Sequence, residues 1–324
     1  MKLKIVKGAA DAVKHLFWQT QISILRACPP LCGVVSERSM GASNSFRVWL
    51  KTLLRLAEET PHAIAQHMRD KRENRVVLAR VILIVTTRCT LNCDKCMACI
   101  PDLKAHEDVP LCDLLEDLRS LFSCVDYIYS LIISGGEVFL HPQLDEIIRA
   151  CSDVRKVGSI TLDTNGTVIP GREVLLSLRE AKTLVQISRY PSALQPEVER
   201  LKSVFSANNI PYTHESAAFW RDTGVLGQQQ EGSKQNNKFS ACYLQLCMPF
   251  YRGKLHLCSK TPALMEIGAL TGCEEDYIDL RRTSPERIGG ELTQLRKKRA
   301  VAACAYCQGI YNAPRVPVAK QREQ

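Results

Sequence analysis

Three cysteines stand close together directly after an apolar, β-branched run, and they are the residues most able to do unusual chemistry. Cys89, Cys93 and Cys96 follow the segment 81–87 with the spacing C-x3-C-x2-C. Thiolates in one short loop suit soft metals and iron–sulfur clusters, because a compact loop turns several sulfurs inward. Only three cysteines share this tight spacing. A four-iron cluster held here would keep one iron open for another ligand, and that opening indicates catalysis instead of storage.

The composition indicates a reducing environment for these thiols. The chain has 324 residues, of which 15 are cysteines, and a formal net charge of +9. No signal-peptide pattern and no apolar run of transmembrane length is visible in it. We therefore expect a cytoplasmic protein whose clustered thiols bind metals or clusters and do not form disulfides. The positive charge gathers at the two ends without a nucleic-acid motif, which predicts a solvated surface and no nucleic-acid partner.

Polar motifs follow the predicted strands directly. Gly135 and Gly136 let the backbone approach a ligand closely, and Glu137 supplies an acceptor for an ammonium group. Asn165 lies in a turn that either faces a ribose or is an ordinary Asn-Gly turn. Ser188-Arg189 ends the next strand, where the arginine either pairs with a carboxylate or lies on the surface.

Alternating strands and helices position these residues. Because buried strands alternate with amphipathic helices, we expect an α/β fold of parallel βα units. Such folds bind ligands at the carboxyl edge of the sheet, where the motifs lie. The predicted strands are 81–87, 127–134, 159–163, 184–188 and 211–215, and the predicted helices are 112–122, 144–154, 173–181 and 196–207.

The regions outside these units differ in composition. Apolar residues recur at helical spacing from Phe46 to Ala57, and a hairpin is predicted at 249–258 with its turn at Arg252-Gly253. We divide the chain into a helical N-terminal extension (1–78), a core (79–218), a linker or lid (219–240), a cysteine-bearing domain (241–312) and a disordered tail (313–324).

The order of strand, Thr-Thr-Arg, C-x3-C-x2-C and a second strand ending in Gly-Gly-Glu resembles the radical S-adenosylmethionine (SAM) superfamily. The resemblance covers 79–218, with a second module to 308. It implies a partial (β/α)6 TIM-like barrel and a core [4Fe–4S] cluster on Cys89, Cys93 and Cys96. One departure is Lys95, at a position that is usually aromatic. SAM binding is implied for Gly135, Gly136, Glu137, Asn165, Ser188 and Arg189.

The C-terminal cysteines resemble the auxiliary iron–sulfur (SPASM or twitch-like) modules of many radical SAM enzymes. A second [4Fe–4S] cluster is then implied, and a zinc site with the same ligands is the alternative. A zinc site completed by Cys99 or His106 is the corresponding alternative for the core cysteines. The implied auxiliary ligands are Cys247, Cys258, Cys304 and Cys307, with Cys242 as the alternative to Cys247.

The resemblance implies an enzyme that cleaves SAM reductively to methionine and a 5′-deoxyadenosyl radical, which abstracts a hydrogen atom from a substrate. A net oxidation is expected if the second cluster accepts an electron. The substrate stays open between a sugar or nucleotide-sugar and a peptide, and the expected reductant is a flavodoxin or ferredoxin. A non-catalytic electron-transfer protein is the alternative class, but it would not need the Gly-Gly-Glu turn.

Overall fold

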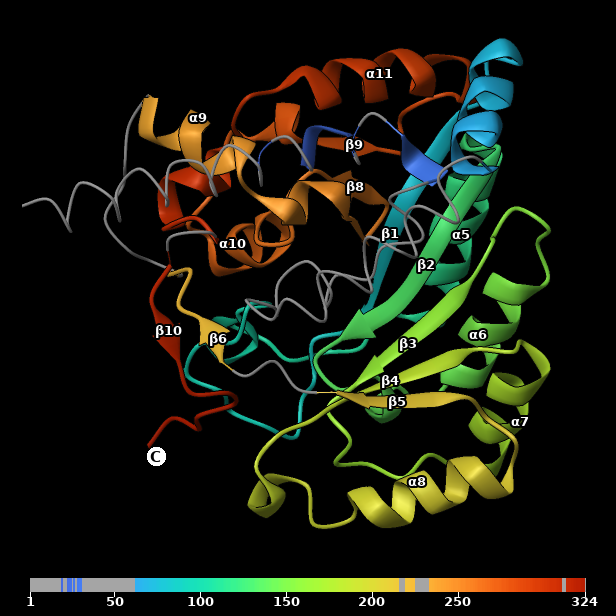
Figure 1. Ribbon diagram of the computed structural model, residues 1–324, viewed down its shortest axis with the longest axis vertical. Coiled ribbons are helices and arrows are strands. Elements are labelled where there is room, and N and C mark those ends of the chain that lie inside the picture. Colours follow the sequence, from blue (N-terminus) through green and yellow to red (C-terminus); the bar gives the residue numbers. More distant parts are fainter. Residues whose placement is uncertain are drawn as a thin grey trace, which may run out of the picture.

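A computed structural model describes residues 19, 22–24, 26, 28–30, 62–215, 219–224, 233–310 and 313–323. Its centre is a sheet of eight strands in the order β5-β4-β3-β2-β1-β7-β8-β9 (Figure 1). Strands β1 to β5 and β7 run parallel, and β8 and β9 are antiparallel to their neighbours. The predicted α/β fold with a parallel sheet is confirmed.

The parallel strands agree with the apolar runs of the sequence. β1 reads VLARVILIVT, and its residues are buried or half-buried because helices and the C-terminal region cover the sheet. The strands are β1 (Val77–Thr86), β2 (Tyr127–Gly135), β3 (Ile160–Thr164), β4 (Leu184–Ser188), β5 (Tyr212–Glu215), β6 (Trp220–Arg221), β7 (Met248–Tyr251), β8 (Lys254–His256), β9 (Tyr277–Asp279) and β10 (Arg315–Val316).

The helices that follow β1 to β4 lie along one side of the sheet (Figure 1). Leu114, Leu118 and Leu121 of the first of them face the core, as their helical spacing predicts. The helices are α5 (Leu111–Cys124), α6 (Leu144–Ser152), α7 (Arg172–Glu180), α8 (Val198–Ala207), α9 (Ser233–Ser240), α10 (Thr261–Ile267) and α11 (Pro285–Lys297). Short 3-10 helices are η1 (Ile100–Asp102), η2 (Val138–Leu140), η3 (Ser192–Leu194), η4 (Tyr243–Leu246), η5 (Glu274–Asp276) and η6 (Ala302–Tyr306).

The C-terminal module, which is the cysteine-bearing domain at residues 241–312, continues the sheet instead of forming a separate layer. β7 pairs in parallel with β1, with Val81 opposite Met248. The turn into β8 has φ +49° at Arg252 and +75° at Gly253, which is the left-handed geometry that two-residue hairpin turns need. The predicted hairpin is confirmed. The sixth parallel strand therefore lies beside β1 and not beside β5.

Two segments that the sequence predicts to be irregular contain regular structure. In the expected linker 219–240, the described residues include β6 and α9. In the expected disordered tail, β10 pairs antiparallel with β6, with Val316 opposite Trp220. Backbone pairing between residues so far apart leaves no local pattern in the sequence, which is why composition alone indicated disorder.

The N-terminal region is described only in part. Residues 62–72 are helical, and Cys28 is buried with its sulfur facing the Ala63 carbonyl oxygen at 3.8 Å. The predicted apolar face at 46–57 lies outside the described residues. Among the residues that the structure covers, no helix has the length and apolar character needed to cross a membrane.

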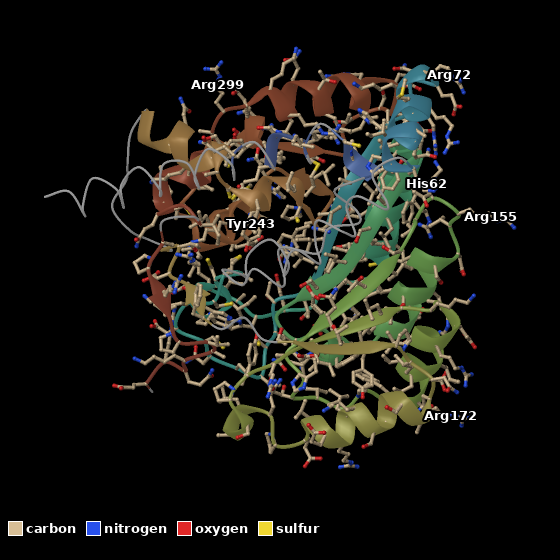
Figure 2. All side chains as sticks on the ribbon, viewed as in Figure 1. His62, Arg72, Arg155, Arg172, Tyr243 and Arg299 are labelled. Atoms are coloured by element: carbon tan, nitrogen blue, oxygen red, sulfur yellow. The ribbon has the colours of Figure 1, made fainter. Side chains whose placement is uncertain are left out.

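Much of the positive charge lies on the outside of the molecule. The side chains of Arg72, Arg155, Arg172 and Arg299 are exposed and lie at the periphery (Figure 2). These arginines come from separate elements and form no single stripe along one helix. This arrangement agrees with the solvated-surface interpretation of the net charge.

A partly buried ion pair ties the C-terminal module to α5. Arg281 Nε and Nη2 donate to the two carboxylate oxygens of Asp117 at 2.6 and 3.0 Å. Burial raises the pKa of Asp117, and the hydrogen bonds from Arg281 lower it. Arg281 passes over Gly253, where a Cβ would lie 2.7 Å from its Nε. The hairpin turn and the ion pair therefore depend on each other.

We expect Arg281→Met to lower the free energy of unfolding by about 1–3 kcal/mol, because the buried carboxylate of Asp117 loses its two donors. Urea denaturation followed by circular dichroism measures this loss. The matched control is Arg282→Met, since Arg282 is 87% exposed and pairs with Asp279 at 3.7 Å. That variant should change stability by less than about 0.5 kcal/mol. Equal losses in the two variants would contradict the assignment.

Candidate functional site

The cysteine loop begins at the carboxyl end of β1 and is anchored by the Thr-Thr-Arg motif. Thr86 Oγ1 hydrogen-bonds Asp108 Oδ1 at 2.6 Å, and Arg88 Nη1 donates to Asp108 Oδ2 at 2.8 Å. Thr87 Oγ1 accepts a hydrogen bond from the backbone N–H of Glu107 at 2.8 Å. The three residues thus fasten the start of the loop to the segment before α5.

Two of the core sulfurs receive hydrogen bonds from side-chain amides. Asn165 Nδ2 lies 3.6 Å from Cys89 Sγ, and Gln321 Nε2 lies 3.2 Å from Cys93 Sγ. Burial raises the pKa of both thiols, to about 11 for Cys93, and these amide donors lower it. The donors come from β3 and from the C-terminal segment, which the sequence separates widely from the loop.

The third core sulfur, that of Cys96, receives hydrogen bonds from the backbone of its own loop. Burial raises the pKa of Cys96, and backbone hydrogen bonds from Ile100, Ala98 and Cys99 lower it. The charges of Cys89, Cys93 and Cys96 also influence one another's pKa, so the three sulfurs share one site.

This donor set fits an iron–sulfur cluster. Each of the three sulfurs has at least one N–H donor, and hydrogen bonds to sulfur are a normal feature of cluster sites. Within the described ranges, no three His, Cys, Asp or Glu side chains are placed to hold one metal ion. His106, the candidate fourth zinc ligand, has its Nδ1 3.3 Å from the Thr87 carbonyl oxygen.

The two glycines after β2 bring that strand against the cysteine loop. A Cβ at Gly135 would lie 2.3 Å from the Thr86 carbonyl oxygen, and one at Gly136 would lie 2.2 Å from the Arg88 carbonyl oxygen. Backbone N–H groups of Gly136 and Glu137 donate to these same oxygens at 2.9 and 2.8 Å. The sequence predicts that these glycines let the backbone approach a ligand. The structure shows that they let the backbone approach the cysteine loop.

Glu137 is fully buried and joins the ends of β2 and β3. Its carboxylate accepts hydrogen bonds from Thr164 Oγ1 at 2.8 and 2.9 Å and from the backbone N–H of Asn165 at 2.8 Å. The backbone N–H of Phe139 adds a bond of 3.1 Å. Burial raises its pKa to about 7, against the opposing effect of these bonds. The expected contact with an ammonium group stays a prediction, whereas the link between the two strands is visible.

Asn165 faces the cysteine loop. Its Nδ2 donates to Thr90 Oγ1 at 3.0 Å, in addition to Cys89, and its Oδ1 accepts from the backbone N–H of Thr167 at 2.9 Å. Its backbone oxygen accepts a hydrogen bond from Gln195, a buried residue that the sequence analysis missed. Gln195 also donates to the Ser188 backbone oxygen at 2.7 Å and so ties β3 to β4.

The end of β4 presents Tyr190 to the core cysteines. Burial raises the pKa of Tyr190, a hydrogen bond with Ser188 lowers it, and the charges of Cys93, Cys96 and Cys89 raise it further. Arg189 is exposed, and its charge lowers the pKa of Glu199 on α8. The structure therefore brings Tyr190 toward the cysteines, with Ser188 as its hydrogen-bond partner, and places Arg189 at the surface. An aromatic residue directly after a strand end was the available signal for Tyr190.

The two irregular residues of the loop make structural contacts. Lys95 Nζ lies 3.3 Å from Asp222 Oδ2, in the segment that follows β6. Cys99 is fully buried and packs with Ile100, Leu103 and Ala263. Burial raises the pKa of Cys99 to about 12. These contacts hold the loop against the C-terminal module.

Four of the C-terminal cysteines lie near enough to one another for their charges to interact. Burial raises the pKa of Cys242, and the charges of Cys258, Cys307 and Cys304 add to the increase. The predicted first ligand, Cys247, instead has its sulfur 3.6 Å from Arg80 Nη1 on β1. Cys242 thus lies near Cys258, Cys304 and Cys307, and the choice between Cys242 and Cys247 as the first ligand stays a prediction.

Polar atoms beside Cys258 support a bound group at these cysteines. Ser259 Oγ and Thr261 Oγ1 are buried and hydrogen-bond no atom of the protein. Backbone hydrogen bonds from Lys260 and Thr261 lower the pKa of Cys258, against the effect of burial. Each of the four thiols has a backbone N–H donor, as cluster ligands have, and a second cluster or a zinc ion at these cysteines stays a prediction.

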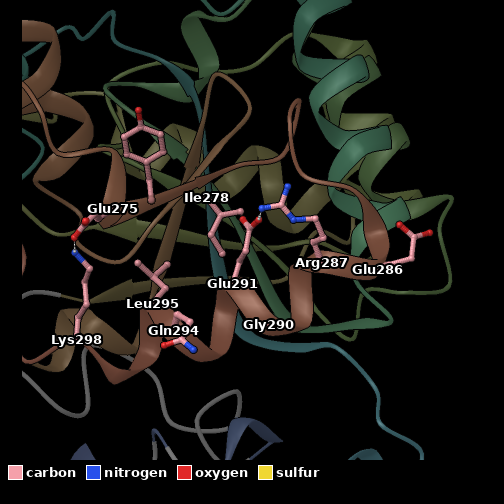
Figure 3. Close-up of a pocket in the computed structure, with 10 residues that line it drawn as sticks. Glu275, Ile278, Glu286, Arg287, Gly290, Glu291, Gln294, Leu295 and Lys298 are labelled. Atoms are coloured by element: carbon pink, nitrogen blue, oxygen red, sulfur yellow. Dashed lines mark hydrogen bonds and ion pairs between the residues drawn. The ribbon is translucent and has the colours of Figure 1, made fainter.

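A surface pocket lies between β9 and α11, and none of the cysteines lines it (Figure 3). Its volume is about 690 Å³. Lys298 Nζ lies 3.4 Å from Glu275 Oε2 across the pocket, and Arg287 pairs with Glu291 along α11 at 3.0 Å. Its polar groups are thus largely satisfied within the protein.

Comparison with known proteins agrees with this geometry. Residues 83–202 match the model of the Radical SAM superfamily. This part of the chain is therefore similar to radical SAM domains. It is 32% identical over 133 residues to a GTP 3′,8-cyclase of Aquifex aeolicus, which is 40% of this chain and 39% of the cyclase. The chain thus spans about two fifths of the length of this relative.

Two solved structures are also similar. BtrN in complex with AdoMet and 2-DOIA matches 76% of this chain and 97% of its own, with 13% identity and a TM-score of 0.47. SuiB of Streptococcus suis bound to S-adenosylmethionine matches 49% of this chain and 39% of its own, with 19% identity and a TM-score of 0.37.

We expect Gly136→Ala to keep the fold and lose most of the iron at the core site, because its Cβ would push the cysteine loop away from β2. Iron per chain after reconstitution is the measurement, in a protein that also carries Cys304→Ala and Cys307→Ala. Gly171→Ala is the matched control, since a Cβ there has no neighbour within 4 Å. Parental iron content in Gly136→Ala would show that the close approach is dispensable.

We expect Cys242→Ala to lose the metal of the C-terminal site and Cys247→Ala to keep it. Both variants are made in a chain that lacks the core cysteines, and iron and zinc are counted separately by mass spectrometry. Cys247 is fully buried and Cys242 is half-buried, so a loss of metal confined to Cys242→Ala would not follow from packing alone. The reverse result would restore Cys247 as the ligand, and zinc without iron would replace the second cluster by a zinc site.

Proposed function

We propose that this protein is a radical SAM enzyme that abstracts a hydrogen atom from its substrate. When bound, the core cluster supplies one electron that cleaves SAM to methionine and a 5′-deoxyadenosyl radical. One observation carries the proposal: each of the three core sulfurs has an N–H donor. These sulfurs lie at the carboxyl edge of the sheet, where the Gly-Gly-Glu motif also lies. The match of residues 83–202 to the Radical SAM superfamily supports it independently.

In this proposal the core residues have separate roles. Cys89, Cys93 and Cys96 hold the cluster, and Asn165 orients Cys89 through its amide. Glu137 keeps the ends of β2 and β3 together, and Gly135 and Gly136, which pack against the cysteine loop, would lie beside bound SAM. The remaining SAM contacts are assigned to Ser188 and Tyr190 at the end of β4.

The C-terminal module is assigned a second cluster on Cys242, Cys258, Cys304 and Cys307. Hydrogen abstraction leaves the substrate with an unpaired electron, and loss of that electron and a proton would complete a two-electron oxidation. A second cluster held by these thiols would accept that electron, and the enzyme would then be an oxidoreductase. The pairing of β7 with β1 supports this arrangement, because it fixes the module relative to the core site.

The substrate proposed is a small molecule, a sugar or nucleotide-sugar, or else a peptide. The reductant proposed is a flavodoxin or ferredoxin in the cytoplasm. A non-catalytic electron-transfer protein is the competing function. It would not require Glu137 to be buried between two strand ends or the glycines to be pressed against the cysteine loop.

We expect the reconstituted, reduced protein to convert SAM to 5′-deoxyadenosine and methionine, both measured by liquid chromatography and mass spectrometry. Cys93→Ala should abolish the product, because its thiolate holds the cluster. Cys112→Ala is the matched control, since this thiol lies exposed on α5, and it should keep parental activity. Cluster-loaded protein that forms no more 5′-deoxyadenosine than Cys93→Ala would favour the electron-transfer alternative.

A further inference from the structure

The segment 319–322 forms a short backbone pairing with the cysteine loop. Cys93 and Gln321 are antiparallel partners. The backbone N–H of Asp94 donates to the Lys320 oxygen at 2.7 Å, and the backbone N–H of Arg322 donates to the Asn92 oxygen at 2.9 Å. The segment therefore adds a strand-like edge to the loop that carries the core cysteines.

The Gln321 side chain can take only one orientation in this contact. Its Oε1 accepts from the backbone N–H of Asn92 at 2.7 Å. Its Nε2 donates to the Ala319 oxygen at 2.7 Å and points at Cys93 Sγ at 3.2 Å. Because a backbone N–H only donates and a backbone oxygen only accepts, a flipped amide would lose both bonds. An N–H group thus faces the sulfur.

Further contacts hold the segment in place. Arg322 Nη2 lies 2.8 Å from Asp102 Oδ1, and Nη1 donates to the Pro101 oxygen at 3.3 Å. Ala319 is 1% exposed, so the segment is packed as well as hydrogen-bonded. On the other flank, Lys95 pairs with Asp222, whose backbone N–H donates to the Pro314 oxygen at 2.9 Å.

We propose that residues 319–322 are a clasp on the cysteine loop, and that Gln321 is a positioning residue that sets the electron affinity of the cluster through Cys93. The proposal rests on the proposed function in that Cys93 is taken as a cluster ligand. Reduction adds negative charge that is shared by the ligand sulfurs, and an N–H donor stabilises that charge. Gln321 therefore favours the reduced cluster.

The first experiment measures the midpoint potential of the core cluster in the full chain. Electron paramagnetic resonance follows a redox titration, and the core signal is identified by its change when SAM is added. The variants are Gln321→Leu, which removes the donor, and Lys320→Ala, whose exposed side chain leaves the backbone bond to Asp94 intact.

We expect Gln321→Leu to shift the potential to a more negative value. One lost hydrogen bond corresponds to about a threefold to tenfold lower ratio of reduced to oxidised cluster at a fixed applied potential, where tenfold equals 59 mV. Gln321→Glu should shift it in the same direction, because a carboxylate repels the thiolate. Lys320→Ala should keep the parental value. Parental potentials in Gln321→Leu, with equal iron content, would overturn the assignment of Gln321.

The second experiment needs no cluster. Hydrogen–deuterium exchange of the metal-free chain reports the protection of the loop amides, including that of Asp94. We expect Arg322→Leu to increase exchange in the loop several-fold, because the clasp loses its bond to Asp102. The matched control is Arg315→Leu, on β10 shortly before the clasp, where the guanidinium lies over the Phe219 ring. Unchanged exchange in Arg322→Leu would overturn the proposal that residues 319–322 hold the cysteine loop.

The two experiments separate this inference from the proposed function. A chain that binds no cluster fails the proposed function, and the exchange experiment still decides the clasp. A chain that binds the cluster and cleaves SAM, but shows parental potentials and exchange in the variants, keeps the proposed function and rejects the inference.

Discussion

The buried carboxylate of Glu137 is the interaction on which the rest of the site depends. A carboxylate without solvent is costly unless hydrogen bonds satisfy it, and here four contacts from Thr164, Asn165 and Phe139 do so. The same bonds fix the turn after β3, which directs the Asn165 amide at Cys89. A single buried charge thereby couples the ends of β2 and β3 to the cysteine loop.

The cysteine loop is held mainly by residues that are remote in the sequence. β2 presses on it through Gly135 and Gly136, and the clasp residue Gln321 pairs with it from the C-terminal side. Such long-range support costs chain entropy, and the packing of the shared sheet offsets that cost. The loop can therefore present three sulfurs in one arrangement before any cluster binds.

Two opposing influences act on the pKa values of the three core thiols. Burial raises the pKa of Cys89, Cys93 and Cys96, which favours protonated thiols in the metal-free chain. The N–H donors around them favour thiolates, which are the form that ligates iron. Binding of a cluster at this site would therefore release protons, and its affinity would increase with pH.

Much of the architecture could be predicted from the sequence because it depends on local patterns. The β-branched run of β1, the helical spacing of Leu114, Leu118 and Leu121, and the Arg252-Gly253 turn each express an interaction within a few residues. The position of Glu137 directly after a strand was also readable, since the carboxyl ends of parallel strands meet at one edge.

The tertiary structure decided which distant residues meet. It placed β7 beside β1, left Arg189 at the surface and brought Tyr190 and Gln321 to the core cysteines. The spacing of residues in the sequence does not predict these contacts, because backbone pairing and side-chain packing between remote segments depend on the whole fold. The sequence by itself determined the three thiols and their strand end, and the fold determined which residues surround them.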